Sequence, residues 1–204
     1  MRRLLPVLGL LLPAIATAQP VPSVEELGPW RLRCATDRMT DRSDCVLRYR
    51  DAIEAAAPGA GGALALEVID RGGKLVPAVV ARDLTLEGAA RGLLALTASA
   101  QLRFPPSRYF DMPCGIEGRS LVCAPRGEDV ARAAQELPSA DRVLVRMVGF
   151  GAGTPDAQPT ELPLSATVAA LARFRSRAPE PPPPAREGVD ARELLQRLQR
   201  LFGN

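Results

Sequence analysis

Four cysteines are the side chains in this sequence with the most evident chemistry, and they fall into two local pairs. Cys34 and Cys45 stand eleven positions apart, and Cys114 and Cys123 stand nine apart around two glycines. Structural zinc sites usually take ligands two to four residues apart, often with histidine, and thioredoxin-type redox motifs need a Cys-x-x-Cys spacing. Neither spacing fits these pairs. We therefore expect no metal and no cofactor here, and disulfides are favoured instead.

Four cysteines allow three disulfide connectivities, and sequence alone does not choose among them. Local pairing, with Cys34 bridged to Cys45 and Cys114 to Cys123, is the favoured interpretation. Each bridge would close a loop of about ten residues, which is worth roughly 3 kcal/mol in the chain-entropy view of disulfides. A pairing between the two halves of the chain stays open as the alternative.

The chain has no histidine, which excludes serine–histidine and cysteine–histidine nucleophiles. Lys74 is the only lysine, and no serine stands three positions before it. The adjacent acids Glu25–Glu26 and Glu128–Asp129 are candidates for acid–base catalysis, although such pairs more often decorate a solvated surface or begin a helix. We therefore expect a protein that is not an enzyme, with no catalytic residues. The alternative is a histidine-independent, carboxylate-based periplasmic hydrolase, which needs two carboxylates about 5 to 10 Å apart in a cleft.

Residues 1–18 have the pattern of a secretory signal peptide: two arginines, an apolar run over 4–16, and Ala16-Thr17-Ala18 before Gln19. The apolar run is too short for a bilayer, which needs about 20 residues. Loss of this segment removes two arginines and lowers the net charge from +3 to +1, which leaves little support for nucleic-acid binding. The expected product is periplasmic or associated with the outer envelope, where disulfides persist.

The elements that must position the cysteines are mostly strands. Alternating or continuous apolar runs predict strands at residues 30–34, from 45, 63–70, 75–80, 92–104, 119–124 and 142–150. The first two flank a polar, turn-like segment and should form a hairpin that the Cys34–Cys45 bridge crosses. Many short strands separated by glycine-rich loops predict a mainly β fold, a single sandwich-like or barrel-like antiparallel domain over residues 24–177.

Two short helices are expected inside this domain. Residues 128–137 begin with acids suited to a helix N-terminus and are stopped by Pro138. A second helix begins near Ser165. It carries Val168, Leu171 and Phe174 at spacings of three, and we expect these to pack on the sheet.

The composition changes after Arg177. Residues 178–188 include four consecutive prolines and predict an extended linker, because proline lacks the donor needed in a helix or sheet ladder. Residues 189–204 then predict an amphipathic helix with Asp190 as N-cap. Its apolar stripe, the expected partner-binding surface, consists of Leu194, Leu198, Leu201 and Phe202. A helix this short is marginal alone, so the stripe needs a partner: its own domain, a second copy, an envelope protein or a membrane surface.

The segment "LGPWRLRCATDRMTDRSDC" from Leu27 resembles the G-x-W-x-x-x-C…C signature of the invasion-associated locus B family of exported proteobacterial proteins. The later order is similar: a cysteine pair ending in "VCAP", a short helix, "RVLVRMV", then "ELPLSATVAALARF". The resemblance spans Leu27 to Phe174 and excludes the proline linker and final helix. It implies a periplasmic or outer-envelope β-rich domain with no established catalytic residues. Together with the residues themselves, it predicts an exported, disulfide-stabilised, non-catalytic envelope protein that binds a protein or cell-wall partner.

Overall fold

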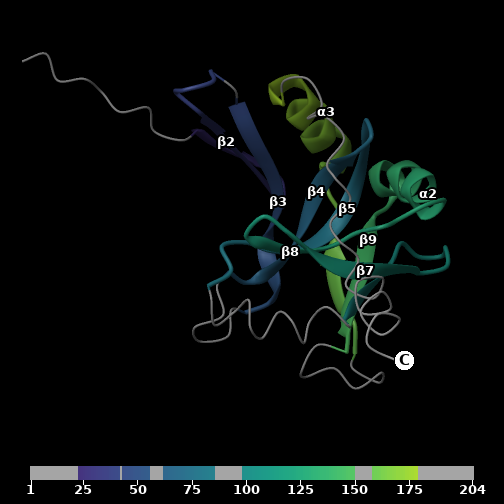
Figure 1. Ribbon diagram of the computed structural model, residues 1–204. Helices are drawn as coiled ribbons and strands as arrows, with labels where there is room; N and C mark the ends of the chain where they lie inside the picture. The colour runs from purple at the N-terminus through teal and green to yellow at the C-terminus, as the bar shows by residue number, and fades with distance from the viewer. Residues whose placement is uncertain (1–22, 42, 56–61, 86–97, 150–157, 179–204) are drawn as a thin grey trace, which may run out of the picture.

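The computed structural model describes residues 23–41, 43–55, 62–85, 98–149 and 158–178, and here it contains one antiparallel sheet of ten strands (Figure 1). The strands are β1 (Ser23–Leu27), β2 (Trp30–Thr36), β3 (Ser43–Glu54), β4 (Leu64–Arg71), β5 (Lys74–Ala81), β6 (Ser99–Arg103), β7 (Phe110–Glu117), β8 (Ser120–Cys123), β9 (Arg142–Val148) and β10 (Thr160–Pro163). The helices are α2 (Asp129–Glu136), the 3-10 turn η1 (Leu137–Ser139) and α3 (Thr167–Arg177). The mainly β prediction with two short helices is confirmed.

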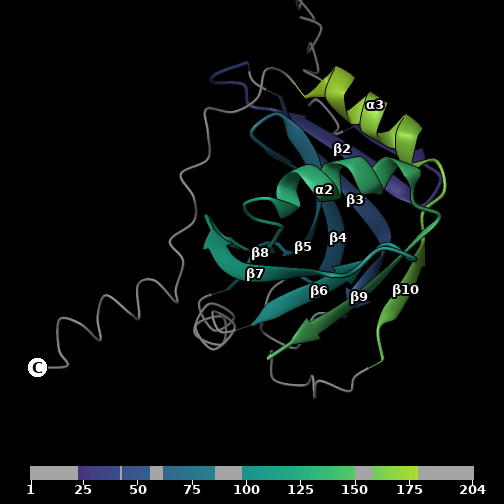
Figure 2. The same ribbon diagram turned by 90° about the vertical axis from the view of Figure 1, so that its right-hand side faces the viewer.

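The strand order is β1-β2-β3-β4-β5-β8-β7-β6-β9-β10. The first five strands follow one another as a meander, and β8 then joins β5 to the second half of the sheet. This sheet curls so that β6, β7 and β9 lie in front of β4 and β5 (Figure 2). Side chains from both halves form one main apolar core. Among the described residues β1 and β10 are the unpaired ends of the order, so the domain is an open, sandwich-like sheet and not a closed barrel.

Helix α3 covers the β1–β2–β3 end of the sheet. Two residues of the Gly28-Pro29-Trp30 stretch contact this helix or the residue before it. Trp30 is fully buried, and its Nε1–H donates to Thr167 Oγ1 of α3 over 3.2 Å. Gly28 turns the chain between β1 and β2 with φ of +62°, and a Cβ there would lie 3.1 Å from the Ala166 Cβ. A glycine is therefore needed both for the left-handed turn and for the close approach of α3.

One expected contact of α3 is wrong. Leu171 and Phe174 are buried as predicted, but the side chain of Val168 is 63% exposed. The buried face is completed by Thr167 and Ala170 instead. At 100° per residue, Val168 lies about 120° around the helix from Phe174, so the two cannot both face the sheet.

Three strands of the structure are absent from the expected set: β1, β7 and β10. The strand β7 includes Pro113 and Gly115, which are depleted in strands because proline lacks an N–H and glycine has no side chain to pack. The short edge strands β1 and β10 carry acids or end in proline. The strand expected over 92–104 occurs as β6 from Ser99, and residues 92–97 lie outside the described residues.

Candidate binding surface

Both disulfides join residues that face each other directly on neighbouring strands. Cys34 of β2 is bonded to Cys45 of β3 with a Cα–Cα distance of 4.1 Å, and Cys114 of β7 is bonded to Cys123 of β8 at 3.9 Å. The local pairing expected from the sequence is therefore the one found. The two bridges differ in environment. Cys114 and Cys123 are buried in the core, whereas Cys34 and Cys45 are only partly buried, and the Cys45 sulfur lies 3.6 Å from the Arg177 carbonyl oxygen at the end of α3.

Three of the four acids named as candidates for acid–base catalysis, Glu25, Glu26 and Asp129, are engaged in ion pairs. Glu25 and Glu26 alternate on β1 and therefore point to opposite faces of the sheet. Glu25 is paired with Arg173 of α3 and Glu26 with Arg31 of β2, each at 2.8 Å. At the start of α2, Asp129 is paired with Arg132. Among the described residues, no three His, Cys, Asp or Glu side chains are grouped to hold a metal ion.

A fully buried carboxylate, Glu67 of β4, lies among the apolar residues of its strand. Arg82 Nε donates to both Glu67 oxygens at 3.0 Å, and its Nη2 donates to Oε2 at 2.6 Å. Arg48, opposite Glu67 on β3, adds a weaker contact to Oε1 at 3.4 Å and donates to the Ala63 carbonyl at 2.9 Å. Burial opposes the charge of Arg82, but the hydrogen bonds and charge of Glu67, with help from Asp44 and Asp83, raise the pKa of Arg82 above its usual value. This cluster holds β3, β4 and the end of β5 together.

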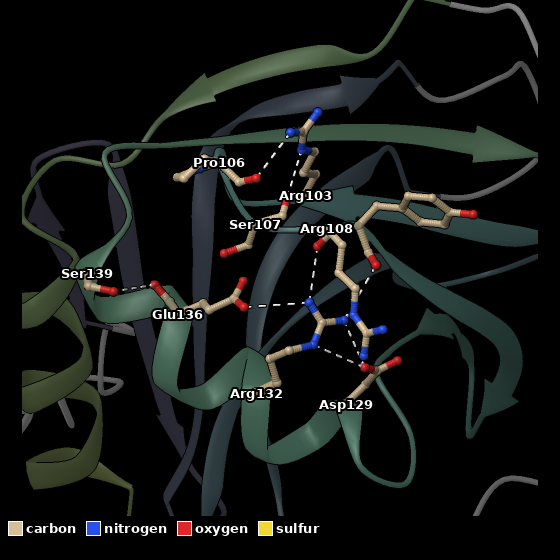
Figure 3. Close-up of polar contacts among 9 residues, drawn as sticks. Arg103, Pro106, Ser107, Arg108, Asp129, Arg132, Glu136 and Ser139 are labelled. Carbon is tan, nitrogen blue, oxygen red and sulfur yellow. Dashed lines mark hydrogen bonds and ion pairs between the residues drawn. The ribbon is translucent and has the colours of Figure 1, made fainter.

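A second arginine cluster lies at the other side of the domain, where residues 104–109 connect β6 to β7. Arg103 donates from Nε to the Ser107 carbonyl at 2.8 Å and from Nη2 to the Pro106 carbonyl at 3.3 Å. The Ser107 amide donates to the Phe104 carbonyl at 2.9 Å. Figure 3 shows Arg103 reaching back over this connection, which we call the 104–109 loop. Half of the loop is thus held by the last residue of β6.

Arg132 of α2 holds the other half. Its Nη1 donates to the Arg108 carbonyl at 3.1 Å and its Nη2 to the Tyr109 carbonyl at 3.4 Å (Figure 3). Its charge is met by Asp129 at 2.8 Å and by Glu136 at 3.5 Å, residues three and four positions away on the same helix face.

An aromatic ring completes the surroundings of Arg132. The centre of its guanidinium lies 3.5 Å from the centroid of the Phe110 ring, a cation–π contact, and Phe110 is itself fully buried. This contact anchors the guanidinium on the core, which allows it to fix the loop. The Oε2 atom of Glu136 is buried and has no hydrogen-bond partner among the described residues.

The loop held in this way exposes Pro106, Arg108 and Tyr109 to solvent. Tyr109 is 55% exposed, the largest aromatic surface among the described residues. Arg108 beside it is exposed, and its guanidinium has no ion pair or hydrogen bond within the described residues. Arginine and tyrosine are two of the residue types that most often dominate protein interfaces. We take the 104–109 loop as the candidate binding surface.

Sequence reasoning did not single out this loop. The stretch "FPPSRYF" contains turn-forming prolines and an Arg-Tyr pair, but nothing local indicates that Arg132, 24 positions beyond Arg108, ties the backbone down. The predicted partner-binding residues Leu194, Leu198, Leu201 and Phe202 lie outside the described residues. Their role stays a prediction.

The fold and these sites define a class of protein, a disulfide-linked, mainly β domain. Among solved structures, the chain is similar to the crystal structure of invasion associated protein B from Bartonella henselae. The TM-score is 0.46 and the identity 11%, over 76% of this chain and 95% of that one. No protein-family model and no curated protein matches the chain. Within its described residues, no helix is both long and apolar enough to span a bilayer.

Proposed function

We propose that this protein is an exported, disulfide-stabilised, non-catalytic envelope protein that binds a protein or cell-wall partner, and that the 104–109 loop is its binding surface. The observation that carries the proposal is the double restraint of this loop. Arg103 and Arg132 take up the carbonyl groups of Pro106, Ser107, Arg108 and Tyr109, while the Arg108 and Tyr109 side chains remain exposed. A loop ordered before binding loses less conformational entropy when its partner arrives.

Export is supported by the pairing of all four cysteines, because disulfides persist in oxidising compartments. The expected signal peptide over residues 1–18 supplies the route. N-terminal sequencing of the protein isolated from its own cells should begin at Gln19. An unprocessed Met1 terminus in that material would contradict the proposed localisation.

Photo-crosslinking in intact cells tests the binding surface. A benzophenone amino acid in place of Tyr109 should form a discrete crosslinked product in the envelope fraction. The same amino acid in place of Met39, the exposed tip of the β2–β3 hairpin, is a matched control that should form far less of it. Equal products from both positions, or none from position 109, would refute the proposed surface.

The C-terminal segment is a second proposed contact. Helix α3 ends at Arg177, and the Ala178 amide donates to the Phe174 carbonyl, so the helix is completed before residue 179. We expect the truncated protein to keep its melting temperature and both disulfides, and to recover less of the crosslinked partner. Replacing Leu194, Leu198 and Leu201 with alanine should reproduce that loss. Unfolding on truncation would instead place the segment in the core, and unchanged recovery would show that it is dispensable.

A further inference from the structure

We infer that the 104–109 loop recognises an acidic peptide segment, with a carboxylate held by Arg108 and the adjoining peptide packed on Tyr109. The inference rests on the proposed function and specifies the partner's chemistry. The 104–109 loop brings together three arginines, Arg103, Arg108 and Arg132, and the structure uses them differently. Two of them face inward onto the loop's own carbonyl groups, and the third does not.

The charges around the loop explain why Arg108 selects an anion. Arg132 is matched by Asp129 and Glu136 on its own helix, so those carboxylates are already engaged. Arg103 uses its Nε and Nη2 groups to hold the Ser107 and Pro106 carbonyls of the loop itself. The guanidinium of Arg108 has no ion pair within the described residues and keeps its donors for a ligand. Arginine matches a carboxylate with two parallel hydrogen bonds, so a carboxylate is the complementary group.

Tyr109 favours a peptide over an isolated small anion. Tyr109 follows Arg108 in the chain and is 55% exposed, so the loop offers apolar area as well as a cationic donor. Tyrosine buries a large surface at little cost in side-chain entropy, because it has only two rotatable side-chain bonds. A chain that carries both a carboxylate and apolar atoms can use both neighbours together. The backbone beneath them is held in place, so the two Cα positions are set before binding.

The test uses the purified, oxidised, full-length mature protein and an array of immobilised twelve-residue peptides. The peptides have random flanks and two fixed central residues, either Glu-Glu, Gln-Gln or Lys-Lys. We expect at least tenfold more protein on the Glu-Glu peptides, with binding that weakens as salt rises. Arg108→Gln should abolish the preference, and Arg108→Lys should keep part of it, because a lysine retains the charge but not the paired donors. Tyr109→Ala should reduce binding to all peptides.

The matched control is Arg33→Gln. Arg33 is an exposed arginine of β2 that also has no ion pair within the described residues, and its replacement should leave the acidic preference intact. Each variant should keep the melting temperature of the unchanged protein, which separates binding from folding. Equal losses in Arg108→Gln and Arg33→Gln would show a general charge effect and overturn the inference.

The two proposals fail in different ways. If position 109 crosslinks a partner in cells but the array shows no acidic preference, the binding surface stands and the acidic-peptide inference is wrong. Crosslinking to a glycan instead of a protein would also refute the inference. If position 109 forms no specific crosslink while the array does show the Arg108-dependent preference, the loop binds acidic peptides but the proposed envelope function is wrong.

Discussion

Two charged clusters in this domain have opposite arrangements of charge: in one, two arginines surround a carboxylate, and in the other, two carboxylates surround an arginine. In the first, the Glu67 carboxylate is held by Arg82 and Arg48 inside the β3–β4–β5 sheet. In the second, Arg132 is held by Asp129 and Glu136 and lies over the Phe110 ring. Glu67 is fully buried, whereas the side chain of Arg132 keeps 23% of its surface exposed.

The difference shows what each cluster is for. Every described hydrogen bond of the Glu67 cluster connects strands or strand ends, so its contribution is to stability. Arg132 donates two hydrogen bonds to backbone carbonyl groups of the 104–109 loop, at Arg108 and Tyr109. Neither of these two residues is part of the core. A buried cluster joins the sheet together, and a half-buried cluster shapes a surface.

The largest effect is expected from Glu67→Gln. Glutamine keeps the size of the side chain but removes the ion-pair partner of Arg48 and Arg82, and only the weaker influence of Asp44 and Asp83 on Arg82 remains. Breaking a buried ion pair from one side costs about 3 to 5 kcal/mol, and the partial exposure of both arginines places the loss near the lower end. Urea unfolding measures it. Arg48→Gln is the control: it removes the 3.4 Å contact with Glu67 and the bond to the Ala63 carbonyl but leaves Arg82 on the carboxylate, so it should cost less than half as much. Similar losses would mean that the two arginines share the carboxylate equally.

The disulfides repeat the contrast between a buried and a half-buried site. Both close loops of similar length, so removal of either by paired alanine substitution should cost roughly 3 kcal/mol in chain entropy. Their access to reductant should differ. Under native conditions, dithiothreitol followed by alkylation and peptide mapping should label Cys34 and Cys45 first. Cys114 and Cys123, inside the core, should be labelled only when the protein unfolds. Simultaneous labelling would contradict this order.

A smaller stability effect is expected from Arg132→Gln. The substitution removes hydrogen bonds from a charged donor and the contact with Phe110, so we expect a loss of about 2 kcal/mol in the free energy of unfolding. The more telling change is local. Amide hydrogen exchange over residues 106–109 should accelerate while exchange in β3–β5 stays as it was. If exchange accelerates evenly across the sheet, Arg132 has a general structural role and not a role in shaping the loop.

The smallest expected effect is a change in the free energy of unfolding with pH, caused by Tyr49 of β3. Burial, with the nearby charge of Asp51, raises the pKa of Tyr49 above the usual tyrosine value of 10.0. The folded state therefore retains the phenol proton that the unfolded chain loses, and stability falls as pH rises above about 10. Between pH 9 and 11 the unchanged protein should lose under about 1 kcal/mol more than Tyr49→Phe does. Tyr109→Phe, at the exposed tyrosine of the loop, is the control. A slope for Tyr49→Phe equal to that of the unchanged protein would refute the assignment.

Local pattern was sufficient for much of the fold. Alternation of apolar and charged residues identified β2 and the start of β3, and with them a hairpin in which Cys34 faces Cys45. Apolar runs identified β4, β5, β8 and β9, and the acids and proline around α2 marked its two ends. These features depend on neighbours a few positions away, because strand and helix periods and turn preferences are properties of short segments.

Tertiary structure alone decided the strand order and the two clusters. Nothing near β7, with its proline and glycine, indicates a strand at the centre of the sheet, and it forms one because β6 and β8 pair with it on both sides. In the sequence, Glu67 is simply an acid within an apolar run. Its ion-pair partners, Arg82 and Arg48, come from other segments and are identified only in the folded structure. The 104–109 loop becomes a defined surface only when α2 places Arg132 above it. The physical reason is common to all three: a buried charge or an unpaired carbonyl needs a partner, and the partner comes from whichever distant segment the packing brings within reach.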